Sequence, residues 1–144
     1  MKRLLAWAVP GLALLCGCRQ ELPAKLQTGE DLYMANCAVC HNTRGEGLMM
    51  YPALAHSQWV DGPPERLAAI ILDGMQRGSD SDVAGVMPSW KTLSDVQIAA
   101  VMSYLRQRDG KPPASSVEVS RVRLETQARN SYWTAGDLRT LKIH

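Results

Sequence analysis

The sequence contains no phenylalanine, only three histidines and four cysteines, and no run of lysine or arginine. Four tryptophans and four tyrosines must therefore supply any aromatic packing. The absence of a basic run, together with a net charge of only +2, argues against a nucleic-acid-binding protein. Hydrophobic residues make up 46% of the 144 positions, which excludes a disordered chain. A single small domain of this length buries a modest core, so a bound cofactor would help to stabilise it.

The N-terminal segment has the pattern of an export signal. Two basic residues precede an apolar stretch from Leu4 to Leu15, which is too short to span a bilayer comfortably. The adjoining Leu15-Cys16-Gly17-Cys18 resembles the cleavage site of bacterial lipoproteins, in which the cysteine after a small residue is acylated. We therefore expect removal of residues 1–17, lipidation of Cys18 and a tether at residues 18–25. An ordinary signal peptide cleaved nearby and an uncleaved anchor are the alternatives.

The other two cysteines belong to the pentapeptide Cys-Ala-Val-Cys-His at residues 37–41, the attachment pattern of c-type haem. Thiols one helical turn apart can both reach the vinyl groups on one edge of a porphyrin and form thioethers. His41 would then offer a ring nitrogen to the iron as the proximal ligand. The motif predicts one haem c, bound covalently through Cys37 and Cys40.

Other functions of this motif are less well supported. A thioredoxin-like redox pair needs a βαβ context, and no strand-like run precedes Cys37. A zinc site would need a second pair of ligands, whereas His56 and His144 are isolated in the sequence. A simple disulfide would suit an exported protein but leaves His41 without a role.

From the haem motif and its flanks, the chain resembles the class I mono-haem cytochromes c. Gly29-Glu30-Asp31-Leu32-Tyr33 precedes the motif, in a helix that Thr28 can cap with Asp31 three residues on, and Tyr51-Pro52-Ala53-Leu54 follows the motif. The resemblance implies an all-α cytochrome c fold, with three to four helices around one haem. We assign the haem domain to residues 26–109 and a C-terminal extension to residues 110–144.

The same resemblance assigns roles to individual residues. Gly29 and Tyr33 are expected to pack against the last helix of the haem domain. The carbonyl of Pro52 is expected to accept a hydrogen bond from the second ring nitrogen of His41, which would orient the ring and raise its basicity.

The sixth iron ligand is expected to be Met87, in Gly-Val-Met-Pro-Ser-Trp at residues 85–90. A methionine followed by proline on an extended loop matches the distal ligand of the family. Met75, which ends a predicted helix, and His56, in a bis-histidine arrangement, are alternatives. A third alternative is an iron with no sixth ligand from the protein.

Two helices are predicted after the haem motif. The first begins at Pro63-Pro64 and ends at Gly74, and the second begins at Ser94 with a capping box. Trp59 and Trp90 are either core residues or donors of an indole N–H to a haem propionate, and both interpretations stay open.

The extension begins with a linker-like stretch around Ser115-Ser116, and Thr134 can cap a last short helix. It resembles the tail of cytochromes associated with membrane dehydrogenases. It could strap over the haem domain, which we take as the default, or dock on a partner.

If protein side chains fill both axial positions of the haem iron, no place is left for a substrate, and one-electron chemistry remains. We therefore expect a lipid-anchored electron carrier on the periplasmic face of a bacterial membrane, and no enzymatic activity of its own. A dehydrogenase or a quinol-oxidising complex would donate electrons, and an oxidase or another cytochrome would accept them. The alternatives are a dedicated haem subunit of a periplasmic dehydrogenase complex and a haem-based gas or redox sensor, or a peroxidase with a displaceable methionine.

Overall fold

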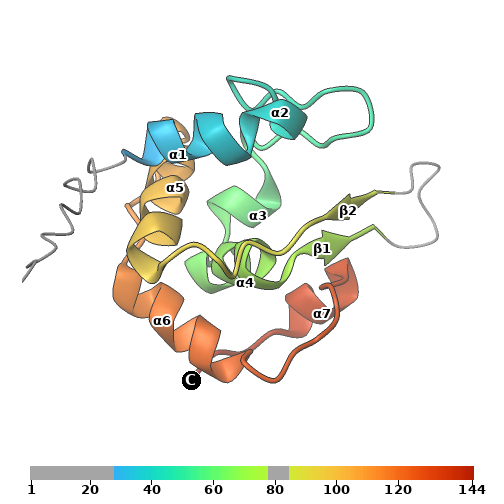
Figure 1. Cartoon of the computed structure of the whole chain (residues 1–144), viewed down its shortest axis with the longest axis vertical. Helices are drawn as coiled ribbons and strands as arrows, with labels where there is room; N and C mark the ends of the chain where they lie inside the picture. Colours follow the sequence, from blue (N-terminus) through green and yellow to red (C-terminus); the bar gives the residue numbers. More distant parts are fainter. Residues whose placement is uncertain (1–27, 78–84) are drawn as a thin grey trace, which may run out of the picture.

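The computed structural model describes residues 28–77 and 85–144, and most of them are helical (Figure 1). The expected signal at residues 1–17, the lipidated Cys18 and the tether at residues 18–25 lie outside the described residues. Within the described ranges, no helix has the length and apolar character that a membrane span requires.

Residues 28–77 and 85–144 contain helices of very different lengths and one pair of short strands. In chain order they are α1 (Gly29–Asn36), α2 (Ala38–His41), α3 (Gln58–Asp61), α4 (Pro64–Asp73), β1 (Met75–Gln76), β2 (Val86–Met87), α5 (Asp95–Arg108), α6 (Ser116–Glu125) and α7 (Ala135–Thr140). Up to residue 109 the described residues form five helical segments, α1 to α5, where three to four were predicted, and an antiparallel two-stranded sheet that an all-α fold does not include. Strands of two residues are too short to leave a periodic pattern in the sequence.

The local signals for helix ends are confirmed. Thr28 and Asp31 form a capping box at α1, and Ser94 does the same at α5 with Gln97. Pro64 is the first residue of α4, and the backbone leaves that helix at Gly74, whose φ is +77°.

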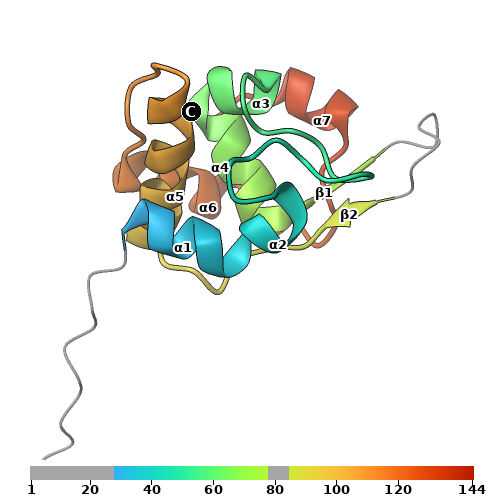
Figure 2. The same ribbon diagram turned by 90° about the horizontal axis from the view of Figure 1, so that it is seen from above.

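Helix α1 packs closely on α5, as the resemblance implied. A Cβ added at Gly29 would overlap the carbonyl oxygen of Ala100, so only glycine permits this approach. Tyr33 is fully buried, with its ring centre 5.3 Å from that of Tyr104. Figures 1 and 2 place this helix pair at the end of the molecule opposite to β1 and β2.

The C-terminal residues 110–144 lie against the preceding helices as a strap. Helix α6 packs on α4 and α5, where Val119 and Val122 are fully buried. The predicted linker is in fact the start of this helix, because Ser115 forms a capping box with Glu118. After α6 the chain runs back toward β1 (Figure 1), and Leu138 of α7 joins the same hydrophobic core.

Candidate haem site

The Cys-x-x-Cys-His motif lies at the junction of α1 and α2. Cys37 ends α1, and its carbonyl accepts hydrogen bonds from the backbone N–H groups of Cys40 at 3.1 Å and His41 at 2.9 Å. This single turn brings both thiols and the imidazole to one short segment. Both cysteines are free thiols and half-buried, whereas His41 is only 8% exposed.

The ring of His41 is oriented by the loop that follows it. Its Nδ1 lies 2.9 Å from the carbonyl oxygen of Pro52. Because a carbonyl can only accept, Nδ1 must carry the proton, and the lone pair is then on Nε2. No described residue forms a hydrogen bond with Nε2. The ring is therefore held in the tautomer that a metal ligand requires.

Gly47 allows the loop to fold back onto the motif. Its φ is +82°, and a Cβ there would lie 2.6 Å from the oxygen of Tyr51 and 2.9 Å from the carbonyl carbon of Pro52. Its own N–H donates to the carbonyl of His41 at 3.1 Å. A larger residue would force Pro52 away from the histidine ring, so Gly47 supports the geometry of His41.

The Cys37 thiol has the electrostatics of a buried group. Burial, and to a smaller extent the neighbouring Cys40, raises the pKa of Cys37 to about 11. Such a thiol stays protonated at neutral pH, whereas thiol–disulfide oxidoreductases lower the pKa of their attacking cysteine. Two unpaired thiols beside an imidazole with a free Nε2 form a donor set that fits a haem of the c type.

Met87 and Met75 are direct cross-strand neighbours. Met87 lies in β2 opposite Met75 of β1, and both are half-buried against the hydrophobic core. Directly paired residues project from the same face of an antiparallel sheet, so both thioethers lie on one side. His56, the other alternative ligand, has a side chain that is 81% exposed, and its N–H donates to Asp109. An exposed turn residue is poorly placed for a buried axial position.

The two tryptophans flank different parts of this region. Trp59 lies in α3, and Trp90 follows the β2 segment, with its backbone N–H donating to the carbonyl of Ile71 at 2.9 Å. Both side chains are half-buried against the core. Neither indole N–H has an acceptor within residues 28–77 and 85–144, so both are available for another group.

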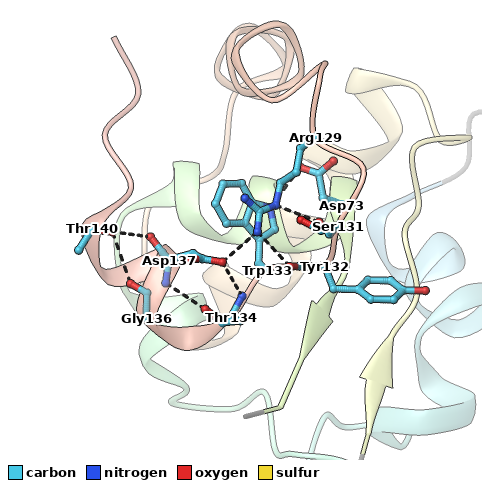
Figure 3. Close-up of polar contacts among 9 residues, drawn as sticks. All are labelled: Asp73, Arg129, Ser131, Tyr132, Trp133, Thr134, Gly136, Asp137 and Thr140. Atoms are coloured by element: carbon cyan, nitrogen blue, oxygen red, sulfur yellow. Dashed lines mark hydrogen bonds and ion pairs between the residues drawn. The ribbon is translucent and has the colours of Figure 1, made fainter.

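A polar cluster that the sequence did not predict lies beside β1. Asp73 is buried at the end of α4 and accepts a hydrogen bond from Trp133 of the extension (Figure 3). It also forms an ion pair with Lys91 of the segment after β2. The available signal was an aspartate at the end of an otherwise apolar helix. Its partners are distant in the sequence and could not be read from spacing.

A helix that crosses a later helix through a glycine contact, followed directly by a turn that carries two thiols and an imidazole, defines a c-type cytochrome domain. A family model described as cytochrome c oxidase, cbb3-type, subunit III matches residues 24–105, which is more than half of the chain. The chain belongs to this family, and membership implies a covalently bound haem c.

Individual relatives carry the same kind of domain. The chain is 31% identical over 99 residues to the cytochrome c subunit of the quinone alcohol dehydrogenase of Gluconobacter oxydans (strain 621H), covering 65% of this chain and 21% of the relative. It is 33% identical over 96 residues to the cbb3-type cytochrome c oxidase subunit CcoP of Rhodobacter capsulatus, covering 60% and 30%. Cytochrome c6 of Cyanidium caldarium is 27% identical over 88 residues, which is 61% of this chain and 75% of that protein. The chain thus spans less than a third of the length of the two larger relatives.

Proposed function

We propose that the protein is an electron carrier that holds one haem c through Cys37 and Cys40, with His41 and Met87 as axial ligands. When bound, the haem supplies one-electron exchange between ferric and ferrous iron. The observation that carries this proposal is His41, whose Nδ1 is held at the Pro52 carbonyl while Nε2 has no partner among the described residues.

The protein side chains would do the positioning. Pro52 orients the imidazole and raises its basicity, because its carbonyl draws the proton on Nδ1. Met87 sits on a strand that pairs with β1, and a rigid backbone suits a weak thioether ligand. The free indole N–H groups of Trp59 and Trp90 would donate to the haem propionates. With both axial positions taken, no place is left for a substrate, which favours electron transfer over catalysis.

The proposed location is the periplasmic face of a bacterial membrane. Cys18 would carry the lipid, and residues 18–25 would tether the domain to that face. The relatives indicate the classes of redox partner, because one relative is a subunit of a dehydrogenase and another is a subunit of an oxidase. A dehydrogenase would therefore donate electrons, and an oxidase or another cytochrome would accept them.

A second candidate is a dedicated haem subunit of a periplasmic dehydrogenase complex. The cytochrome c subunit of the quinone alcohol dehydrogenase supports it, since that relative functions within a named enzyme. Purification of the protein from its native membranes in mild detergent separates the candidates. A stoichiometric dehydrogenase in the preparation would establish the subunit, and isolation of the cytochrome alone would establish the carrier.

Carbon monoxide binding to the ferrous protein tests the axial assignment. We expect the wild-type protein to bind no carbon monoxide at neutral pH, and Met87→Ala to bind it readily. Met75→Ala is the matched control, because Met75 is the cross-strand neighbour on the same face. Opening of the site by Met75→Ala alone would assign the ligand to Met75. Ready binding by the wild-type protein would instead favour a gas sensor or a peroxidase.

A further inference from the structure

Trp133 of the extension adds to the outer edge of the small sheet. Its N–H donates to the carbonyl of Gly74 at 3.0 Å, and its carbonyl accepts from the N–H of Gln76 at 2.9 Å. These bonds form a parallel bridge between Trp133 and Met75. Strand β1 therefore lies between Trp133 on one edge and β2, which carries Met87, on the other.

A buried carboxylate joins the same three segments through side chains. The side chain of Asp73 is only 1% exposed. Its Oδ2 accepts the indole N–H of Trp133 at 3.1 Å, and its Oδ1 lies 2.5 Å from the ammonium nitrogen of Lys91. Lys91 also donates to the carbonyl of Arg129 at 3.0 Å. The segment that follows Met87 is thus tied to α4 and to the extension at one point.

The extension is locked in the conformation that makes these contacts. The guanidinium carbon of Arg129 lies 3.6 Å from the ring centre of Trp133. Figure 3 shows the two side chains together. Arg129 also donates to the carbonyls of Ser131 at 2.9 Å and Tyr132 at 3.0 Å, and to the carboxylate of Asp137 at 2.9 Å. The tryptophan is therefore presented to β1 by a network within the extension itself.

Gly74 brings the two outer segments together at the end of α4. A Cβ at this position would overlap the carbonyl oxygen of Met87 and lie 2.8 Å from Cδ1 of Tyr132. The backbone of Met87 and the ring of Tyr132 therefore touch the same glycine. A displacement of the extension would remove one wall of the space that holds the Met87 backbone.

From these contacts we propose that the C-terminal extension positions Met87, with Trp133, Lys91 and Asp73 as positioning residues. The inference rests on the proposed function, in which Met87 is an axial ligand. A thioether is a weak ligand, so its occupancy depends on how firmly the chain holds it. We call these three residues and their contacts the clamp. The clamp lowers the fraction of molecules in which the sixth position of the iron is open, and an external ligand binds in proportion to that fraction.

Imidazole binding to the ferric holoprotein, followed by absorption spectroscopy, measures this open fraction. Trp133→Phe removes the N–H donor and keeps most of the ring, and Lys91→Gln removes the ammonium at a position that is partly exposed. We expect each variant to bind imidazole about tenfold more tightly, the equilibrium change of one hydrogen bond to a charged group. The weak near-red absorption band of methionine-ligated ferric haem should weaken in parallel.

Val122→Ala and Lys142→Gln are the matched controls. Val122 is buried in α6 away from β1, and Lys142 is an exposed lysine of the extension. We expect Val122→Ala to lower the melting temperature without tightening imidazole binding, and Lys142→Gln to match the wild-type protein. An unchanged affinity in Trp133→Phe and Lys91→Gln, or an equal increase in Val122→Ala, would overturn the inference. If Trp133→Phe does not fold, Lys91→Gln decides the question.

Met87→Ala separates this inference from the proposed function. Tighter imidazole binding in Met87→Ala with no change in the clamp variants would refute the clamp alone. No change in Met87→Ala would show that Met87 is not the ligand, and would overturn both the axial assignment and the clamp.

Discussion

Substitution of Gly29 by alanine should separate α1, the helix that precedes the haem motif, from α5. The added Cβ would overlap the carbonyl oxygen of Ala100 and lie 2.7 Å from its carbonyl carbon and 3.0 Å from Cβ of Tyr104. Carbon atoms in normal contact are about 3.5–4.0 Å apart. Because the main obstacle is backbone, no side-chain rotation can relieve the overlap, and α1 must move away from α5.

The size of the effect follows from that displacement. A shift of about 1 Å across a packed helix contact corresponds to overpacking, which costs about 1–3 kcal/mol in protein cores. We expect a value near the upper end, about 3 kcal/mol, because two backbones collide. For a domain of this size such a loss lowers the melting temperature by roughly 10 °C. Cys37 is the C-cap of α1, so the haem motif moves with this helix.

Thermal unfolding of the ferric holoprotein, followed by circular dichroism, measures the loss. Gly136→Ala is the matched control, because Gly136 also lies in the first turn of a capped helix and the nearest atom to its added Cβ is the Thr134 hydroxyl at 3.7 Å. We expect this control to be neutral or slightly stabilising. A melting temperature of Gly29→Ala equal to that of the wild-type protein would refute the close contact, as would an equal loss in Gly136→Ala.

Further substitutions test other parts of the account. Arg106→Leu should lower the free energy of unfolding, measured by chemical denaturation, by about 3 kcal/mol or more, because the buried guanidinium donates to three backbone carbonyls that would lose their partner. The control Arg121→Leu, at an ion pair near the surface, should lower it by less than about 1 kcal/mol. Hydrogen bonds from the N–H and hydroxyl of Thr134 lower the pKa of Asp137, so its contribution to stability is present above the ordinary aspartate pKa and is lost as the pH falls through the lowered value. Asp137→Asn should therefore be less stable than the wild-type protein at neutral pH, and the two unfolding curves should converge in acid. Cys18→Ser should release the protein into the soluble fraction of fractionated cells, and retention on the membrane would contradict the lipid anchor.

Short-range signals in the sequence predicted the helix ends well. The capping pairs at Thr28 and Ser94 involve residues three positions apart, so their geometry depends on local backbone alone. The close approach at Gly29 followed from a family resemblance, which carries information about contacts that spacing does not. The capping box at Ser115 is an equally local signal, but the segment after it has only a weak apolar stripe, so the sequence pattern there predicts a linker and not the helix α6.

Contacts between distant segments could not be predicted. Asp73 and Trp133 are sixty positions apart, and their contact depends on how α6 crosses α4. The pairing of Met75 with Met87 has the same origin, since strands of two residues leave no pattern. At the site, the placement of Cys37, Cys40 and His41 on one turn is local, whereas the contact of His41 with Pro52 requires the loop to return through Gly47.

The covalent haem is the central claim, and intact mass spectrometry of the denatured protein, produced in cells that mature c-type cytochromes, tests it most directly. We expect the mass to exceed that of the polypeptide by one haem, and a protein with both Cys37→Ser and Cys40→Ser to lose this increment. A wild-type mass without haem, or a haem retained under denaturing conditions in the double variant, would contradict it.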